Sequence, residues 1–551
     1  MRLTNRIAAA VLSGAMVLSL AGCAANANAN ANANANANSS SATSDAAASS
    51  AVSTAAVSND IVVASASLGN TLNPWDQTDG TTSAFQYALY DRLVQYATKT
   101  DENGNEVADT EKIVGSIAES WETSEDGLTW TFHIDPNATF ANGDKVTSED
   151  VIWSFENARD NANSSFFFTL TQISDMQAPD DSTVVFTLSQ RSNMFLRLLE
   201  IYVFCIVDKS EAEAGIATDP NFLTTHACGS GPYELTSYDT TNAVVLTSRG
   251  DNYWGANKAK NNSVTYKLVQ EASDRQLLLQ KGDVDIALDL EDKNISKVSE
   301  MEGVSVLQFA SNKHLFFCLN NNVAPFDDAR VRQAIAYAIP YDSLVNDVMY
   351  GNAVVTTSML PDNVNGHISD DKTRYTTDLE KAKELLADAG YPDGFSCKMT
   401  LGNGFTDWEE SAVTIQAALK QIGIDMEINE VDRSAFLTDA ATGNLQCFFN
   451  RFNPFIGDPG YLVNCMYTSS SSYNYFNYNN AEFDALYTKA EAEDTEEARL
   501  EDYKQLQYIF AEDCPVVELY QYGFAYCARD NVNGFVFYPD LTLRFASISK
   551  G

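Results

Sequence analysis

Apolar and polar positions along this chain follow two different periods. Residues 127–134 (GLTWTFHI) place Leu128, Trp130, Phe132 and Ile134 on one face with a period of two, which predicts a half-buried β-strand. In other segments the apolar positions recur every three to four residues, which predicts amphipathic helices. The chain therefore contains both kinds of element.

Two of the predicted helices carry a start signal, and one of them also carries a stop signal. Residues 147–150 (TSED) resemble a capping box, and an apolar face follows them. Asp378 caps a second helix whose last apolar position is Ala389; Gly390 ends this helix, and Pro392 prevents it from resuming.

Near the start of the folded part, residues 61–64 (IVVA) predict an apolar strand, residues 73–76 (NPWD) a loop and residues 82–96 a helix. Strands and helices are interleaved along the rest of the chain, with no repeat at a fixed period. We therefore expect an α/β fold.

The first residues have the features of a secretory signal peptide, which we expect to span 1–22. Residues 1–6 carry two positive charges, and residues 7–20 form an apolar run that is shorter than the about 20 residues needed to cross a bilayer. The next segment, 20–23 (LAGC), resembles the bacterial lipobox, which implies that Cys23 becomes a lipid-modified N-terminus that anchors the protein to a membrane. The alternative is an ordinary cleaved signal peptide followed by an incidental cysteine.

Residues 23–58 form a low-complexity segment of Ala, Asn, Ser and Thr without apolar periodicity. Such a sequence buries too little surface to offset the entropy of ordering its chain. We expect it to be a tether between the anchor and the folded part, which is long enough to form two or three lobes.

Charge narrows the range of partners. The chain has 75 acidic and 35 basic residues, a net charge of −40. Nucleic acid is excluded as a partner because phosphate binding needs a basic surface. After the signal peptide, the best candidate for a membrane span, 194–207, is interrupted by Arg197 and Glu200.

Catalytic and metal-binding motifs are missing from the sequence. The four histidines show no HExxH or other ligand spacing, and no GxSxG nucleophile motif occurs. We therefore expect neither an enzyme nor a resident cofactor or metal. Eight cysteines remain after Cys23; an exported location permits disulfides, but their apolar surroundings suit reduced, buried thiols equally well.

Eight short segments, spread over most of the chain, together resemble the family 5 solute-binding proteins, the peptide and nickel group of ABC importers. The segments are 117–121 (IAESW), 126–132 (DGLTWTF), 140–151 (FANGDKVTSEDV), 229–233 (GSGPY), 251–255 (DNYWG), 282–286 (GDVDI), 325–334 (PFDDARVRQA) and 381–390 (KAKELLADAG). Read without the family, these motifs are mostly scaffold, because Gly, Pro and helix caps set turns and element ends.

The resemblance implies a periplasmic-binding-protein-like architecture with two α/β lobes, a hinge and a cleft, plus a third lobe. Lobe I would comprise 59–91, 225–318 and 526–551, lobe II 92–224, and lobe III 319–525. A small ligand would bind between lobes I and III, which would close around it by hinge motion. A monomer would then deliver the ligand to membrane permease domains, with ATP hydrolysed on separate subunits.

The resemblance also identifies positions that would contact the ligand. Peptide-binding relatives hold the ligand's α-amino group with an Asp four residues before the proline of an Asp-Pro-like motif; that motif is 457–459 here, and the matching position is Phe455. A desolvated ammonium without a counter-charge is costly. Either Asp458 or Asp79, on a loop that lines the cleft in relatives, would have to supply the charge, and we favour Asp79. The alternative for Asp79 is a turn residue before a glycine.

Other candidates for ligand contact are an arginine, three aromatic residues and an amide. Arg433 aligns where peptide-binding relatives place a Trp and would bind a carboxylate; alternatively it is a surface arginine paired with an acid such as Asp432. The remaining candidates are Trp75, Phe452, Trp408 and Asn320. Large aromatic residues more often pack in cores, which is the alternative for each of the three.

These observations favour capture of a peptide or peptide-like solute for an importer, on the extracytoplasmic face of the membrane. Two alternatives remain open from the sequence. The protein could instead be a lipoprotein that receives a peptide signal or acts as an envelope chaperone, because these functions also need only a closing cleft. Within the family, a metal chelate, haem or a sugar is a further class of ligand.

Overall fold

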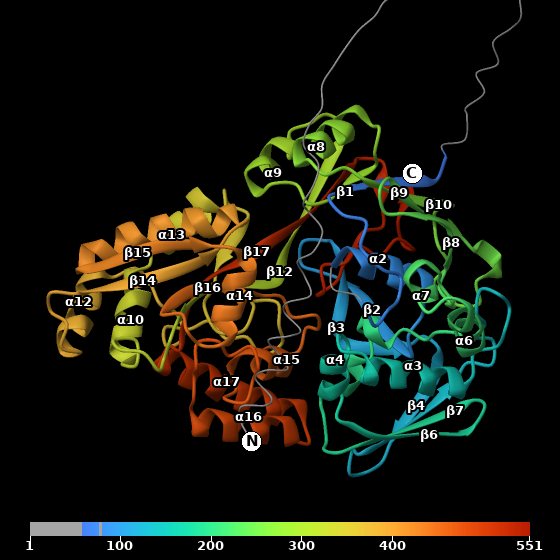
Figure 1. The fold of residues 1–551 in the computed structure, drawn as a ribbon, viewed down its shortest axis with the longest axis horizontal. Helices are drawn as coiled ribbons and strands as arrows, with labels where there is room; N and C mark the ends of the chain where they lie inside the picture. The colour runs from blue at the N-terminus through green and yellow to red at the C-terminus, as the bar shows by residue number, and fades with distance from the viewer. Residues whose placement is uncertain (1–57, 77–79) are drawn as a thin grey trace, which may run out of the picture.

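The computed structural model describes residues 58–76 and 80–551. The predicted signal peptide, Cys23 and nearly all of the predicted tether lie outside these residues, as does Asp79. Within them the structure is mixed α/β, as predicted from the interleaved strands and helices (Figure 1).

In the described residues the largest sheet has eleven strands. Their order is β15-β14-β16-β12-β17-β11-β1-β10-β9-β8, and β13 pairs with β17. The strands are β1 (Asp60–Ser65), β8 (Tyr233–Asp239), β9 (Ala243–Ser248), β10 (Ser263–Leu268), β11 (Ile286–Ala287), β12 (Val304–Leu319), β13 (Ala353–Val355), β14 (Phe395–Gly402), β15 (Ile424–Val431), β16 (Cys447–Phe452) and β17 (Val516–Arg529).

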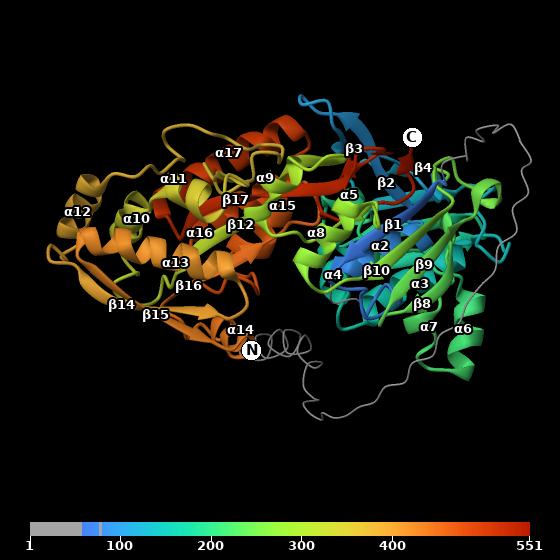
Figure 2. The same cartoon turned by 90° about the horizontal axis from the view of Figure 1, so that it is seen from above.

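This sheet has two halves. The β1 half consists of β1 and β8–β11, with α2 (Gly80–Leu89), α8 (Ala272–Lys281) and α9 (Asp292–Ser299). The β14 half consists of β13–β16 and their helices, which lie on the other side of the molecule in Figures 1 and 2. These helices are α10 (Ala329–Ala338), α11 (Tyr341–Ser343), α12 (Leu379–Asp388), α13 (Thr406–Leu419), α14 (Arg433–Ala441), α15 (Pro459–Leu462), α16 (Ala481–Ala492) and α17 (Glu496–Asp513).

Two long antiparallel strands, β12 and β17, connect the halves. Their pairing is irregular between Ala310 and His314. At that point Ser311 donates its hydroxyl to the carbonyl of Tyr522 at 2.7 Å, and the Gln521 amide donates to the Ser311 carbonyl at 2.6 Å. A bulge that interrupts the ladder is a suitable place for a bend between two rigid halves.

A third body, the β5 unit, packs beside both halves. It contains a sheet of order β4-β5-β7-β6 and five helices. Its elements are β4 (Ala118–Thr123), β5 (Thr129–Ile134), β6 (Ile173–Asp180), β7 (Thr183–Leu188), α3 (Ser148–Asp160), α4 (Ser165–Leu170), α5 (Phe195–Leu198), α6 (Lys209–Thr218) and α7 (Phe222–Thr225). Two small sheets complete the fold: β2 (Val94–Thr100), β3 (Glu106–Gly115) and β19 (Val536–Phe537), and β18 (Val532–Asn533) with β20 (Ser549–Lys550).

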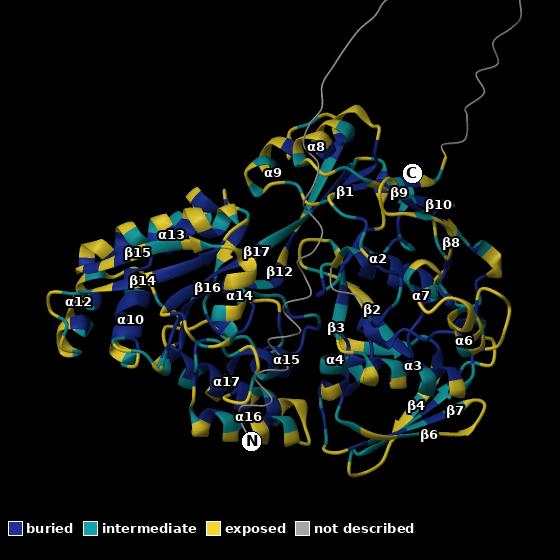
Figure 3. Cartoon of the chain, in the orientation of Figure 1, coloured by how far each residue is buried: buried dark blue, intermediate teal, exposed yellow. Residues whose placement is uncertain are grey.

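Buried apolar side chains fill the space between sheets and helices, whereas the outer faces of α8, α9, α12 and α13 are exposed (Figure 3). None of the helices in the part of the chain that the structure describes is long and apolar enough to cross a membrane.

Several local predictions are confirmed. Thr147 caps α3 with a complete capping box, and Asp378 caps α12. Gly390 follows α12 with a φ of 92°, a left-handed conformation that glycine adopts at little cost. The strand predicted over 127–134 is β5, in which Phe132 and Ile134 are buried.

The predicted helix over 82–96 is wrong in its second half. Helix α2 ends at Leu89, and β2 begins at Val94. The reason is a buried tertiary contact: the Asp91 carboxylate accepts hydrogen bonds from Ser230, Tyr253 and Trp254, at 3.0–3.1 Å. These partners lie far along the chain. Their hydrogen bonds hold Asp91 in a non-helical position, so α2 ends before it.

Candidate functional site

Three parallel strands of the β14 half end at one edge of the sheet. β14 runs parallel to both β15 and β16. The residues at or just after their carboxyl ends are Phe405, Arg433 and Phe452. In open α/β sheets this is the edge at which ligands bind.

Two arginines share one aromatic ring at this edge. The guanidinium carbon of Arg433 lies 4.5 Å from the centre of the Phe405 ring, and that of Arg451 lies 4.7 Å from the same point. Neither guanidinium forms an ion pair with an acid among the described residues. Partial desolvation and repulsion from Arg451 lower the pKa of Arg433.

Arg433 was predicted from its sequence position. It is exposed, as the alternative of a surface arginine expected, but it forms no ion pair with Asp432. Asp432 instead accepts a long hydrogen bond from Asn403, at 3.4 Å. Sequence reasoning missed Arg451 and Phe405. The only signal for Arg451 was a charged residue near the end of the apolar strand 447–452.

A third cation, Lys313, lies where β12 passes between the halves. Its ammonium is 4.2 Å from the centre of the Tyr522 ring, and Tyr522 donates its hydroxyl to Asp407 at 2.5 Å. Burial and the nearby Arg451 lower the pKa of Lys313 to about 8, although Asp407 and Asp292 act in the opposite direction. Burial raises the pKa of Asp292, on α9 of the β1 half, to about 6. Lys313 thus has acids on both halves around it, whereas neither arginine forms an ion pair with a described acid.

Two predicted aromatic residues have different surroundings. Phe452 is half-buried and packs against Tyr461 and Tyr473, with ring centres 6.2 and 6.5 Å apart. Trp408 is 5% exposed and packs against Phe405, in the core of the β14 half. Phe452 is therefore the more accessible of the two, and the position of Trp408 favours a packing role.

Trp75 and Asn320 are also buried. Trp75 packs edge-to-face against Trp153, with ring centres 5.5 Å apart, and its indole N–H has no hydrogen-bond partner among the described residues. The Asn320 amide donates to the carbonyls of Gly443 and Leu445, at 3.1 and 2.8 Å. These bonds fix a turn inside the β14 half and occupy the amide that was expected to reach a ligand.

Phe455 packs against the β5 unit. Its ring lies 5.5 Å from that of Phe167 and 6.1 Å from that of Tyr202, edge-to-face in both cases. The side chain at the position where relatives are expected to place an acid therefore joins two bodies of the protein.

The Asp458 carboxylate is committed to other groups of the protein. It caps α15 by accepting from the Gly460 N–H at 2.8 Å, and it forms ion pairs with Arg499 at 2.5 Å and Arg197 at 3.1 Å. Although burial favours the neutral acid, the two guanidiniums outweigh it and hold the pKa of Asp458 below its ordinary value. The geometry disfavours rotation of this carboxylate toward a ligand.

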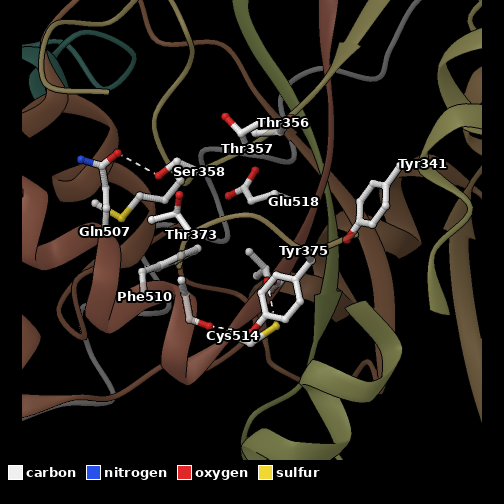
Figure 4. A pocket seen from close by; sticks show the side chains of 13 residues that line it. Tyr341, Thr356, Thr357, Ser358, Thr373, Tyr375, Gln507, Phe510, Cys514 and Glu518 are labelled. Atoms are coloured by element: carbon white, nitrogen blue, oxygen red, sulfur yellow. Dashed lines mark hydrogen bonds between the residues drawn. The ribbon is translucent and has the colours of Figure 1, made fainter. Parts of the chain in front are cut away.

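Two cavities in the described part of the chain lie away from this edge of the sheet. One, inside the β14 half, has a volume of ≈ 20 Å³, and the Glu518 carboxylate points toward it from β17 (Figure 4). This volume fits about one water molecule, so the cavity is too small for a solute. The other, of ≈ 320 Å³, lies on the β5 unit and is lined by residues that include Trp121, Trp130 and Arg191.

No cluster of His, Cys, Asp and Glu suited to a metal ion occurs within 58–76 and 80–551. His314 is fully buried, and burial lowers its pKa to about 3. The eight described cysteines are buried and unpaired, so the reduced alternative is the one that the structure shows.

Residues 112–474 match the family described as bacterial extracellular solute-binding proteins, family 5. This match covers more than half of the chain. The chain belongs to this family.

Relatives of this solute-binding protein align over most of their length. It is 30% identical over 497 residues to the probable D,D-dipeptide-binding periplasmic protein DdpA of Escherichia coli K12, covering 89% of this chain and 94% of the relative. It is 27% identical over 504 residues to the dipeptide-binding protein of the same organism, covering 87% and 92%.

Among solved structures, HbpA2 of Haemophilus parasuis superposes with a TM-score of 0.80 at 24% identity, covering 90% of this chain and 100% of HbpA2. DppA of Helicobacter pylori, solved in complex with the peptide STSA, gives a TM-score of 0.75 at 26% identity, covering 89% and 98%. The fold is therefore that of a periplasmic binding protein, as the sequence motifs implied.

Proposed function

We propose that this protein is the extracytoplasmic solute-binding lipoprotein of an ABC importer. It captures a peptide or peptide-like small ligand and delivers it to membrane permease subunits. The single observation that carries the proposal is the edge of the β14 half where Phe405, Arg433 and Phe452 converge, beside the two strands that lead into the β1 half. Binding sites of α/β proteins lie at such edges, where two bodies can close on a solute.

The proposed lobes follow from the same strands. Lobe I (59–91, 225–318 and 526–551) would contain the β1 half, lobe II (92–224) the β5 unit, and lobe III (319–525) the β14 half. The irregular pairing between Ala310 and His314 supports a hinge close to the proposed boundary at 318. The ligand would lie between lobes I and III.

Candidate ligand contacts divide into two groups. Arg433, Phe452 and Asp79 are proposed to touch the ligand directly; Asp79 lies outside the described residues. Trp75, Trp408, Asn320, Phe455 and Asp458 are proposed to shape the site, because each is already engaged in packing or hydrogen bonds within the protein.

Mass spectrometry of the full chain, purified in mild detergent without denaturation, tests the binding function. We expect a co-purified small solute, and we expect the protein to be thermally stabilised when that solute is added back after removal. If no solute co-purifies, and pools of peptides, sugars and metal chelates all leave the melting temperature unchanged, the proposed function is wrong.

The lipid anchor needs its own experiment. Cells fed an alkyne-tagged fatty acid should label the wild-type protein and leave the Cys23→Ser variant unlabelled. Labelling of both proteins, or of neither, would contradict the anchor without affecting the binding function.

A further inference from the structure

The pair Arg433 and Arg451 has a chemical consequence for the ligand. Their guanidinium carbons lie 4.5 and 4.7 Å from the centre of one ring, that of Phe405, so they lie within about 9 Å of each other. Arg451 belongs to β16, and Arg433 begins α14 directly after β15. Two strands thus bring two like charges together at the carboxyl edge of the sheet.

The guanidiniums of Arg433 and Arg451 have no ion-pair partner among the described residues. The sequence has 75 acidic residues against 35 basic ones, yet no described acid forms an ion pair with either guanidinium. Of the nearby acids, Asp432 accepts from Asn403, and Asp407 accepts from Tyr522. Asp407 and Asp292 both act on Lys313. The arginine pair is thus without an ion-pair partner among the described residues.

Arginine pairs suit particular ligands. A guanidinium stays charged at every physiological pH and presents a planar fork of donors that matches a carboxylate. Two guanidiniums beside one aromatic ring can together donate several hydrogen bonds to the oxygens of one carboxylate. A bound anion would further reduce the repulsion between the two cations, so such a site favours anionic over neutral solutes.

The surroundings of residue 455 lack a matching site for a cation. Phe455 packs against Phe167 and Tyr202, and the nearby Asp458 is paired with Arg499 and Arg197. None of these groups offers a free carboxylate to an ammonium. The described groups around residue 455 therefore have no carboxylate available to neutralise a ligand ammonium.

We propose that the ligand is an acidic solute whose carboxylate binds between Arg433 and Arg451 over Phe405, and that a free α-amino group is not required for binding. This inference rests on the proposed function, because it assumes that the edge of the β14 half is the binding site. It adds the chemical class of the ligand and assigns Arg451 and Phe405 to the site.

The test uses pools of one set of tripeptides prepared in four forms, with the N-terminus free or acetylated and the C-terminus free or amidated. Binding to the full chain is measured by thermal shift and then by calorimetry. We expect the two forms with a free carboxylate to bind, with or without the acetyl group, and the amidated forms to bind at least about 10-fold more weakly.

Variants connect this preference to the arginines. Arg451→Met and Arg433→Met should each weaken binding of the carboxylate forms about 10- to 100-fold, the usual effect of losing a charge-assisted hydrogen bond. Arg451→Lys should give an intermediate loss, because it keeps the charge and loses the fork. Lys420→Met removes one exposed positive charge at the far end of α13 and should leave binding unchanged.

Salt separates a binding role from a folding role. Raising NaCl should weaken wild-type binding of the carboxylate forms and affect Arg451→Met less, because the charge that salt screens has been removed. Equal binding of amidated and free forms, or loss of binding on acetylation, would overturn the inference and leave the proposed function intact. If no form binds and no solute co-purifies, the proposed function fails and this inference fails with it.

Discussion

Arg197 of the β5 unit donates to Asp458 of the β14 half, with 3.1 Å between Nη1 and Oδ2. The Asp458 side chain is 1% exposed and that of Arg197 is 17% exposed, so this contact is a largely desolvated link between two bodies of the protein. Phe455 packs across the same boundary. Arg197→Met should loosen the boundary at a cost of about 1.5–3 kcal/mol, typical of a hydrogen bond to a charged group.

Small-angle scattering checks this first prediction. The ligand-free Arg197→Met variant should have a larger radius of gyration than the wild type, because fewer contacts hold the β5 unit against the β14 half. Arg159→Met, on the outer side of α3, serves as the control and should match the wild type. An unchanged radius together with an unchanged melting temperature would show that Arg197 does not hold the two bodies together.

Loss of the ion pair between Asp458 and Arg499 should cost more stability than loss of the contact between Asp458 and Arg197. Arg499 is fully buried, and it donates to Asp458, Glu491 and Glu496. Asp458→Asn removes its closest counter-charge and should cost about 3–5 kcal/mol in the free energy of unfolding, measured with urea. Asp160→Asn breaks the exposed pair with Arg159 and should leave the free energy of unfolding nearly unchanged.

The pH dependence of this difference has a defined sign. The guanidiniums of Arg499 and Arg197 lower the pKa of Asp458 in the folded state, despite burial. Its contribution is therefore present above the unfolded pKa of about 3.9 and is lost as the pH falls through the lower, folded value. The stability difference between wild type and Asp458→Asn should be constant near neutral pH and shrink below about pH 4. A difference that grows on acidification would contradict the assignment.

Local features of the fold were predictable because their causes lie within a few residues. The capping box at Thr147 needs only Asp150, and the end of α12 needs only Gly390. The false extension of α2 has the opposite cause, since the partners that hold Asp91 are about 140–160 residues away. Local helix propensity contains no information about contacts between residues so far apart in the sequence.

The candidate site was predictable only in part, for the same reason. The family resemblance proposed Arg433, and Phe452 was proposed because it flanks a loop that contains a proline; the two residues lie at or just after strand ends. The resemblance could not identify the sharing of Phe405 by Arg433 and Arg451, because these three residues come from three separate segments that only the parallel sheet brings together. Nor could the sequence show that Asp458 is paired with Arg197, 261 positions away.

A buried carboxyl at the small cavity in the β14 half provides a second prediction on pH. Burial raises the pKa of Glu518 well above its ordinary value, and Tyr467 donates to Oε1 at 2.9 Å. A raised folded pKa means that stability is fully present below the unfolded pKa of about 4.3 and is lost as the pH rises through the folded value. Glu518→Gln keeps the shape and cannot ionise, so it should become more stable than the wild type as the pH rises from 5 to 8.

Urea unfolding at pH 5 and pH 8 measures this effect. At pH 8, the free energy of unfolding of Glu518→Gln should exceed that of the wild type by about 1.4 kcal/mol for each pH unit between the unfolded and the folded pKa of Glu518. If the folded pKa lies above 8, only the interval up to pH 8 counts. His314 lies 3.3 Å from Glu518 and also titrates on unfolding. It is present in both proteins, so the difference between them reports Glu518. A Glu518→Gln variant that tracks the wild type at both pH values would mean that this carboxyl ionises normally.

Two variants of Phe455 test whether this side chain packs between two bodies of the protein or faces a ligand. Phe455→Leu keeps an apolar side chain against Phe167 and Tyr202 and should cost less than about 1.5 kcal/mol. Phe455→Asp places a carboxylate between two rings without a partner and should cost more, about 2–4 kcal/mol, measured by urea unfolding near neutral pH. If residue 455 instead faced solvent in an open cleft, Asp would be tolerated as well as Leu. The order of the two variants therefore decides whether this side chain joins the β14 half to the β5 unit.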